Sequence, residues 1–541
     1  MSSITEETNG PFGPIFLIRD ENSKNTLYLP SRANESWALY PFYGRFFAII
    51  SNQYSEQLKH CSFGPAIVLS GLMMCSISDG YIFGQMSGMI DSLRSPDSSI
   101  RLTDDDISWI ASILNMTCLC GYALLAVVCE YFGRGKTVGL LSIPVLASWI
   151  MVYFAQDRIV LLASRVIVGV FYGGILILTY ICVGEYIPYR TRAFHTNFMS
   201  SVGNITGTTL GHVLSIVLHW RTVALIGIIP TTLSIILALC WEESPSWLAG
   251  KRRFDDCEKS FKSLHMPSIE SDRELKSIIA HEKQKQSECS KFNQTSFWSR
   301  TLSACKRKYF WRIMGLSFVT QIYRIAGGRI LFSTFAITML QDITGHSYIL
   351  LFTLAVDGCG IIGALISCGF IRKFKMRKLI LVSGTISNLI LILTSVSLFY
   401  LNDTFVNVCI KIGFLALYFI TVYAGPYAVM DSLLSEIFPL EIKTFCMFLL
   451  GLMGAPIQFL AIKTSPGLFS TIGYHGVLLI NAGIVTLCLI YLWAYLPETK
   501  GRTLQEIEYY FHNGKYENTC SAEWFNNDQI VKINANYKDE Q

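Results

Sequence analysis

The sequence predicts an all-α membrane protein with twelve membrane-spanning helices arranged as two halves of six. Three observations lead to this prediction. The 541 residues are 51% hydrophobic and only 15% charged, whereas a soluble domain carries about 25% charged residues. The chain contains twelve apolar runs long enough to cross a bilayer. A pattern of charged residues and prolines also recurs at the same place in each half.

The apolar runs set the positions of the predicted spans. About 20 residues, rising 1.5 Å each, cross the hydrocarbon core. Runs of that kind occupy residues 63–90, 107–128, 137–155, 159–182, 195–218, 222–241, 310–340, 347–370, 378–400, 408–430, 445–465 and 475–496. They are predicted to be helices, because backbone groups in lipid must be hydrogen-bonded within their own segment. A β-barrel would show alternating segments of about ten residues and does not fit.

The distribution of Lys and Arg predicts that both termini are cytoplasmic. The short loops on that side hold Arg134, Lys136, Arg190, Arg192, Arg372, Lys373, Lys375, Arg377 and Lys443, and the loops on the other side hold Arg94, Arg101, Arg158 and Arg221. The long connection 249–308 adds fourteen Lys and Arg against eight Asp and Glu. We therefore expect a multi-pass plasma-membrane protein with these parts: a cytoplasmic segment 1–62, a first half 63–248, a cytoplasmic helical loop 249–309, a second half 310–496 and a cytoplasmic tail 497–541.

Two short motifs repeat between the halves. The first reads Glu185-x-x-Pro188-x-x-x-Arg192 after the fourth run and Glu436-x-x-Pro439-x-x-x-Lys443 after the tenth. The second reads Glu243-Ser-Pro245 after the sixth run and Pro497-Glu498 after the twelfth. Repeated six-helix halves are the architecture of alternating access, with a binding site between the halves. Carboxylates at helix ends that face Arg or Lys can hold neighbouring helices together, although solvated loop charges without such a role are equally expected.

These motifs resemble those of the sugar porter family of the major facilitator superfamily, over about residues 60–510. The resemblance rests on Ser435-Glu436-Ile437-Phe438-Pro439, Pro497-Glu498-Thr499-Lys500-Gly501-Arg502, Arg165 with Gly169, Trp220-Arg221 and Glu243-Ser-Pro245. It implies a carrier for a sugar or polyol, similar to the animal facilitative sugar and trehalose carriers, with a helical domain in the 249–308 loop. The charges predicted to act as a conformational latch are Arg134, Arg165, Glu185, Arg192, Glu243, Arg377, Glu436 and Glu498.

Several positions depart from the family pattern. After the eighth run the family's acidic residue is replaced by Arg372. Of the paired glutamines in the seventh run only Gln321 remains, and in the tenth run Asp431 replaces a tryptophan. Ile82 occupies the position of the Asp that is typical of proton-coupled members, which favours facilitated transport.

Two arginines, Arg324 and Arg329, fall inside the seventh run. A charge at that depth usually faces a cavity and has a partner. Five residues turn a helix by about 140°, so both side chains can face one cavity only if the helix breaks, for example near Gly327-Gly328. We expect Asp79 or Asp357 to pair with one of them, either in the cavity or as a stabilising pair away from it. The predicted substrate-binding residues are Gln321, Arg324, Arg329, Ser333, Asp79 and Asp431.

Other readings of the chain stay open or are set aside. A sensor that keeps the fold without transporting, and a carrier of an organic anion bound by the arginines, are the alternatives. Four aromatic residues, Tyr81, Phe83, Tyr323 and Phe332, are expected either to stack on a sugar or to pack between helices. No nucleophile motif, metal-ligand spacing or phosphate loop indicates an enzyme or a cofactor, and the mixed charges of 249–308 do not indicate nucleic acid.

Overall fold

The protein is described by a computed structural model covering residues 7–10, 13–18, 27–30, 63–95, 100–187, 189–265, 271–273, 275–280, 282–283, 306, 308–345, 348–438, 443–498, 500 and 510. The chain divides into two compact units, Met1–Cys61 and Ser62–Gln541. The first contains three short antiparallel strands in the order β1-β2-β3, which the sequence analysis does not predict: β1 Glu7–Gly10, β2 Gly13–Ile18 and β3 Leu27–Pro30.

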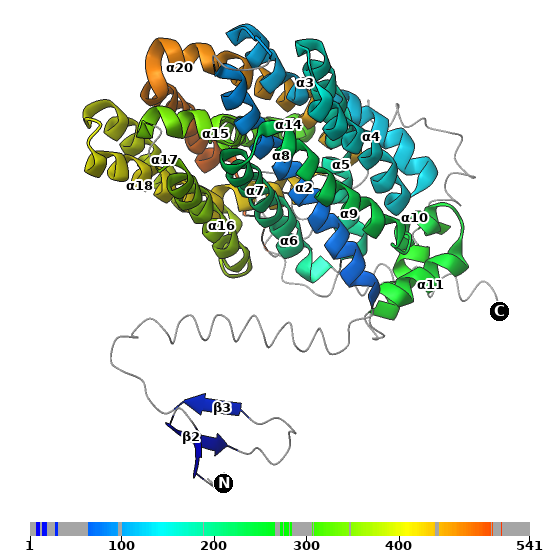
Figure 1. Ribbon diagram of the computed structural model, residues 1–541. Helices are drawn as coiled ribbons and strands as arrows, with labels where there is room; N and C mark the ends of the chain where they lie inside the picture. The colour runs from blue at the N-terminus through cyan, green and yellow to red at the C-terminus, as the bar shows by residue number, and fades with distance from the viewer. Residues whose placement is uncertain are drawn as a thin grey trace, which may run out of the picture. The chain divides into compact units, whose positions relative to one another are not determined.

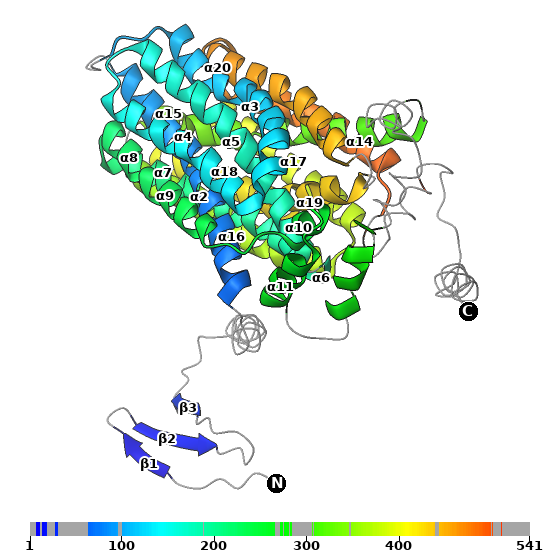
Figure 2. The same ribbon diagram turned by 90° about the vertical axis from the view of Figure 1, so that its right-hand side faces the viewer.

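The second unit is a bundle of helices (Figures 1 and 2). Its first half contains α2 Phe63–Arg94, α3 Asp104–Phe132, α4 Arg134–Phe154, α5 Arg158–Tyr186, α6 Tyr189–Asn197, the π-helix η1 Phe198–Gly203, α7 Asn204–Val217, α8 Trp220–Ile226 and α9 Ile228–Leu239. The short helices α10 Pro245–Gly250 and α11 Phe254–Leu264 follow. The second half contains α14 Lys308–Ala326, α15 Arg329–Thr344, α16 Ile349–Lys373, α17 Met376–Tyr400, α18 Phe405–Val422, the π-helix η2 Tyr423–Tyr427, α19 Ala428–Ile437 and α20 Lys443–Tyr495.

The predicted spans all coincide with helical segments of this unit. Within the described residues, nine helices are long and apolar enough to cross a membrane by length and composition. One of them, α20, has 53 residues and is kinked at Gly473, so it covers the last two predicted spans. The predicted spans 195–218 and 310–340 are the ones absent from the nine, and each contains an interruption of the regular α-helix.

Both interruptions lie where the two halves meet. Span 195–218 consists of α6, η1 and α7. Span 310–340 breaks between α14 and α15 at Gly327 and Gly328, and Gly328 has a φ of 73°, a left-handed conformation that glycine adopts without strain. The expected break near these glycines is therefore present.

A small helical domain lies at the end of the bundle where α2 begins (Figure 2). Leu248, Ala249, Cys257, Phe261 and Leu275 form its buried core. In contrast, large apolar side chains on the bundle helices are exposed, among them Val127, Ile143, Phe154, Leu389, Leu487 and Trp493. Exposed apolar surface of this kind is what helices in contact with lipid require.

Candidate functional site

A cavity of about 180 Å³ lies between the two halves. The first half lines it with α2, α3, α5, α6, η1 and α7, and the second half with α14, α15 and α20. Its polar lining consists of Ser76, Asp79, Asn115, Tyr122, Tyr172, Thr179, Tyr180, Thr196, Ser200, Asn204, Gln321, Arg324, Arg329 and Gln458. A polar cavity at the interface of two repeats is where this architecture binds its solute.

The structure brings four predicted binding residues together in this cavity: Gln321, Arg324, Arg329 and Asp79. The two arginines share it because the helix breaks between them. Asp79 is 5% exposed, and the structure gives its carboxylate no hydrogen bond or ion pair among the described residues.

The expected pairing of Asp357 with an arginine is wrong. Asp357 is bonded instead to His212, whose Nδ1 lies 2.7 Å from Asp357 Oδ2. The expectation of an arginine partner rests on depth in the membrane, and depth does not distinguish which neighbouring helix a side chain faces.

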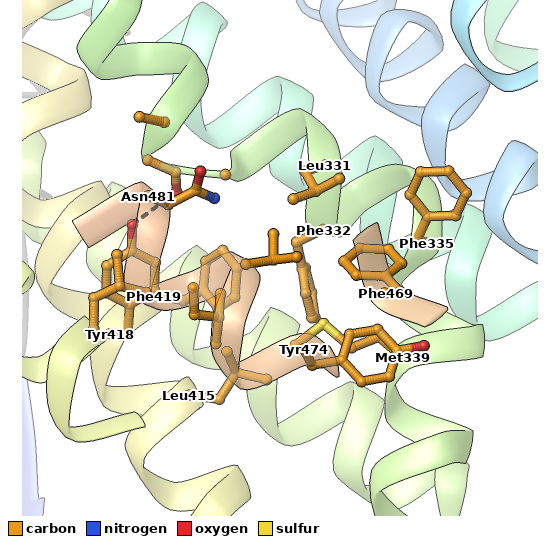
Figure 3. A pocket seen from close by; sticks show the side chains of 16 residues that line it. Leu331, Phe332, Phe335, Met339, Leu415, Tyr418, Phe419, Phe469, Tyr474 and Asn481 are labelled. Atoms are coloured by element: carbon orange, nitrogen blue, oxygen red, sulfur yellow. Dashed lines mark hydrogen bonds between the residues drawn. The ribbon is translucent and has the colours of Figure 1, made fainter. Parts of the chain in front are cut away.

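Two tyrosine hydroxyls stabilise the break between α14 and α15. Tyr418 Oη donates to the carbonyl of Gly327 at 2.7 Å (Figure 3), and the N–H of Arg329 donates to Tyr427 Oη at 3.2 Å. These bonds occupy backbone groups that the break releases from the helical ladder, as required in a membrane interior. The ring of Tyr427 also lies 5.5 Å from the guanidinium carbon of Arg329. The break is therefore a built feature that aims Arg329 at the cavity.

A smaller cavity of about 30 Å³ lies within the second half. Figure 3 shows the side chains that line it. Aromatic and aliphatic side chains line it, including Leu331, Phe332, Phe335, Phe419 and Phe469. It has no charged lining residue and few polar groups, so it lacks the hydrogen-bonding partners that a sugar needs. We therefore take the central cavity as the candidate site.

Sequence reasoning missed most of the neutral polar lining of the central cavity. Asn115 and Asn204 had a visible signal, since both begin an Asn-x-Thr pattern inside a predicted span, where glycosylation is excluded. Gln458 and the three tyrosines gave no signal. A single polar residue in an apolar run does not reveal which way it faces.

Other predicted binding residues lie elsewhere. Ser333 is buried outside the cavity lining, and its backbone carbonyl accepts a hydrogen bond from His212. The side chain of Asp431 lies outside the described part of the chain. Tyr81 donates to the carbonyl of Val223, and Phe83 packs edge-on against Tyr172. These contacts fit the packing alternative for Tyr81 and Phe83.

The predicted latch of the first half forms a connected group. Arg134 Nε lies 2.7 Å from Glu185 Oε2 and Arg134 Nη2 lies 2.5 Å from Glu185 Oε1, a two-bond contact between α4 and α5. The N–H of Arg134 donates to Glu243 Oε1 at 2.7 Å, so Glu243 caps the start of α4. Gly133 has a φ of 84°, and a Cβ there would lie 2.2 Å from Glu243 Oε2.

The second half repeats the cap. Glu498 accepts from the N–H of Met376 at 2.9 Å and of Arg377 at 3.3 Å, at the start of α17. Met376 thus occupies the position that Arg134 has in the first half. Arg377 Nη2 donates to the carbonyl of Trp493.

The remaining latch residues are placed differently. The side chain of Glu436 is outside the part of the chain that the structure describes. Arg192 lies on α6. Arg165 is fully buried within the first half, where its Nη2 donates to Gln85 Oε1 at 3.1 Å, and it lies on α5 well before the helix ends at Tyr186.

The halves also contact each other beyond the cavity, at what we call the far end of the bundle. There Ser87 Oγ accepts from the N–H of Ile337 at 3.0 Å, and Gln341 Nε2 donates to Asp91 Oδ2 at 3.0 Å. Lys463 Nζ and Asp105 Oδ1 lie 2.5 Å apart. The opposite end, which carries Glu243 and Glu498, we call the cap end.

The cavity extends toward the cap end. Its lining includes Val183, close to the last residue of α5, and Met447, close to the first residue of α20. Its lining does not include the residues of the far-end contacts. The halves meet at the far end, and α6 of the first half also contacts α16 of the second, where Asn197 Nδ2 donates to Ser367 Oγ at 2.7 Å.

The model of the family described as "Sugar (and other) transporter" matches residues 65–511. This chain belongs to that family. The predicted carrier function and major facilitator fold are thereby confirmed. Members of this family are transporters and not enzymes. A facilitated trehalose transporter Tret1 of Culex quinquefasciatus is 24% identical over 470 residues, covering 84% of this chain and 87% of the relative. The sugar transporter ERD6-like 6 of Arabidopsis thaliana is 24% identical over 512 residues, covering 91% and 99%.

Solved structures agree on the fold. The proton:xylose symporter XylE bound to 6-bromo-6-deoxy-D-glucose superimposes with a TM-score of 0.69 at 18% identity, covering 84% of this chain and 100% of that one. The human organic anion transporter MFSD10 superimposes with a TM-score of 0.51 at 14% identity. The protein is therefore an integral multi-pass membrane carrier of the major facilitator fold.

Proposed function

We propose that this sugar transporter moves a sugar by facilitated diffusion, with the solute bound in the central cavity and the two halves rocking around it. The observation that supports this most is the composition of the cavity. Four side-chain amides, those of Asn115, Asn204, Gln321 and Gln458, line it together with the hydroxyls of three tyrosines. Amides and phenols pair with sugar hydroxyls as both donors and acceptors. The relatives named as facilitated trehalose transporters make trehalose the first substrate to test.

We propose further that the cap end faces the cytoplasm in the plasma membrane. The excess of Lys and Arg on the loops of that end supports this orientation. In that orientation the central cavity extends toward the cytoplasm. Ile82, at the position of the family's proton-coupling carboxylate, supports transport without proton-driven accumulation.

The test is uptake of labelled trehalose, glucose and xylose into proteoliposomes. We expect saturable uptake that does not exceed the outside concentration and does not change when a proton gradient is collapsed. Gln321→Ala and Gln458→Ala are each expected to lower uptake about tenfold, since one lost hydrogen bond to a bound hydroxyl costs about 1–2 kcal/mol. Gln156→Ala, at an exposed glutamine between α4 and α5, is the matched control.

Other outcomes would redirect the proposal. Ligand binding without flux would indicate a sensor. Uptake of organic anions that is lost in Arg324→Gln and Arg329→Gln, without uptake of sugars, would indicate an anion carrier. Accumulation driven by a proton gradient would remove the facilitated part.

A further inference from the structure

His212 connects the two halves outside the solute cavity. It lies on α7 in the first half and its ring is fully buried. Its Nδ1 lies 2.7 Å from Asp357 Oδ2 on α16, and its Nε2 lies 2.9 Å from the carbonyl oxygen of Ser333 on α15. One side chain of the first half thus holds two helices of the second half.

The carbonyl of Ser333 reaches His212 because α15 is kinked. Phe335 has φ −119° and ψ 15°, which is not helical. In an unbroken helix the Ser333 carbonyl would bond to the N–H of Ile337. Here that carbonyl accepts from His212, and the N–H of Ile337 donates to Ser87 Oγ. Both backbone groups that flank the kink are therefore bonded to side chains of the other half.

The contacts of His212 fix how many protons the group holds. A carbonyl only accepts hydrogen bonds, so His212 Nε2 carries a hydrogen that it donates to Ser333. If Asp357 is ionised, Nδ1 must carry a hydrogen as well, and the ring is an imidazolium. If the ring is neutral, Asp357 must carry the hydrogen and donate it to Nδ1. Either way the pair holds one proton more than a neutral histidine and an ionised aspartate.

The surroundings of His212 supply no other titratable group among the described residues. From α2 the backbone at Gly84 approaches the α7 backbone at His212, and from α15 the ring of Phe332 lies edge-on at 6.4 Å between centroids. From α16 the facing group is Asp357, which is 2% exposed. An unpaired charge in such a site would be costly, so the proton and the two partners are retained together.

We propose that His212, Asp357 and the Ser333 carbonyl form a proton-binding site across the two halves, filled in this conformation and emptied to water when α7 separates from α15 and α16. The inference rests on the alternating access of the proposed function. Since this conformation binds the extra proton, low pH favours it. Raising the pH opposes retention of this proton and therefore favours separation of the halves at the far end.

The first experiment reads the proton directly, without any transport. Full-length protein is labelled with ¹⁵N-histidine, and the His212 signals are assigned by their loss in His212→Gln. At pH 7.5 we expect either two protonated ring nitrogens at His212, or an infrared band of a protonated carboxyl that disappears in Asp357→Asn. Exposed His219 serves as the comparison histidine in the same spectrum. A neutral His212 ring together with an ionised Asp357 would overturn the proposal.

The second experiment reads the conformational equilibrium. Spin labels on noncanonical amino acids at the exposed positions Arg101 and Thr464 report the distance between the halves at the far end. For one linked proton, we expect the ratio of closed to open populations to fall about tenfold per pH unit over the range in which the open state has lost the proton and the closed state still holds it. Asp357→Asn should flatten this slope, because its amide N–H donates to Nδ1 of a neutral ring and preserves every contact without the extra proton.

Asp91→Asn is the matched control, since Asp91 is another carboxylate that joins the halves but contacts Gln341 rather than a histidine. It should keep the wild-type slope. A wild-type ratio that changes with neither pH nor Asp357→Asn, in a protein whose labels do report two distances, would overturn the proposal. Labels that report one distance under all conditions would instead count against alternating access, while the proton measurement would still stand.

Discussion

The two halves cap a helix at the cap end in the same way but differ in the charged residue beside that cap. In both, a carboxylate that follows the sixth helix of the half caps the helix that begins at the cap end: Glu243 caps α4 and Glu498 caps α17. Beside the cap of the first half lies a partly buried ion pair between Arg134 and Glu185, whereas the position of Arg134 is occupied by Met376 in the second half. A carboxylate cap is present in both halves because the first N–H groups of a helix need acceptors. The cap of α17 forms with Met376 in place of Arg134, so the cap does not require the ion pair.

The difference arises from two neighbouring positions. The second half has Met376, which is 3% exposed, where the first has Arg134. It also has Lys375, with φ −69°, where the first has Gly133, with φ 84°. The first half therefore has both the Arg134 charge and, at Gly133, a close approach of the backbone to the Glu243 carboxylate. Substitutions at these matched positions of the two halves test whether they cause the difference.

The largest effect is expected from Arg134→Met, which gives the first half the residue of the second. Glu185 would lose its two-bond partner in a site where the side chains are 14% and 18% exposed. We expect a loss of about 2–3 kcal/mol in the free energy of unfolding, somewhat less than for a fully buried pair. Thermal unfolding of the purified protein measures it.

A double variant separates the lost pair from the lost arginine. Arg134→Met with Glu185→Gln removes the uncompensated charge and should recover at least half of the loss. If the double variant is as unstable as the single one, the interaction between the two charges is not what stabilises this end of the first half.

A smaller effect is expected from Gly133→Ala. The added Cβ would lie 2.2 Å from the Glu243 carboxylate, and the positive φ strains any side chain. A loss of about 2 kcal/mol follows from strain and a displaced cap. The matched change in the second half, Lys375→Ala, should stay within about 0.5 kcal/mol. Equal losses at the two positions would contradict the assigned difference.

The smallest effect is expected from the caps themselves. Glu243→Gln and Glu498→Gln each keep an acceptor but remove the charge at a helix N-terminus, so each should cost about 1 kcal/mol or less. The two losses should agree, because the two carboxylates have the same role. A loss at Glu243 several times that at Glu498 would show that the cap and the Arg134 pair act as one unit.

The frame of the protein was predictable from sequence because its signals are local. Apolar runs of the right length located the spans, and motif spacing paired Glu243 with Glu498. The adjacent Gly327 and Gly328 indicated where a helix could break. The contacts of His212 were not predictable, since a lone histidine in an apolar run has no spacing signature and its partner lies 145 residues away. The same limit hid Gln458 and the tyrosines of the cavity, because facing depends on how the halves meet.

The start of α15 is a short helical segment with an irregularity at each end. One irregularity is the break at Gly327 and Gly328, and the other is the kink at Phe335. The six residues between them span about 9 Å. Arg329 projects into the solute cavity from one end of the segment, and the other end presents the Ser333 carbonyl to His212. A tilt of this segment would therefore move the Ser333 carbonyl relative to His212 of the other half.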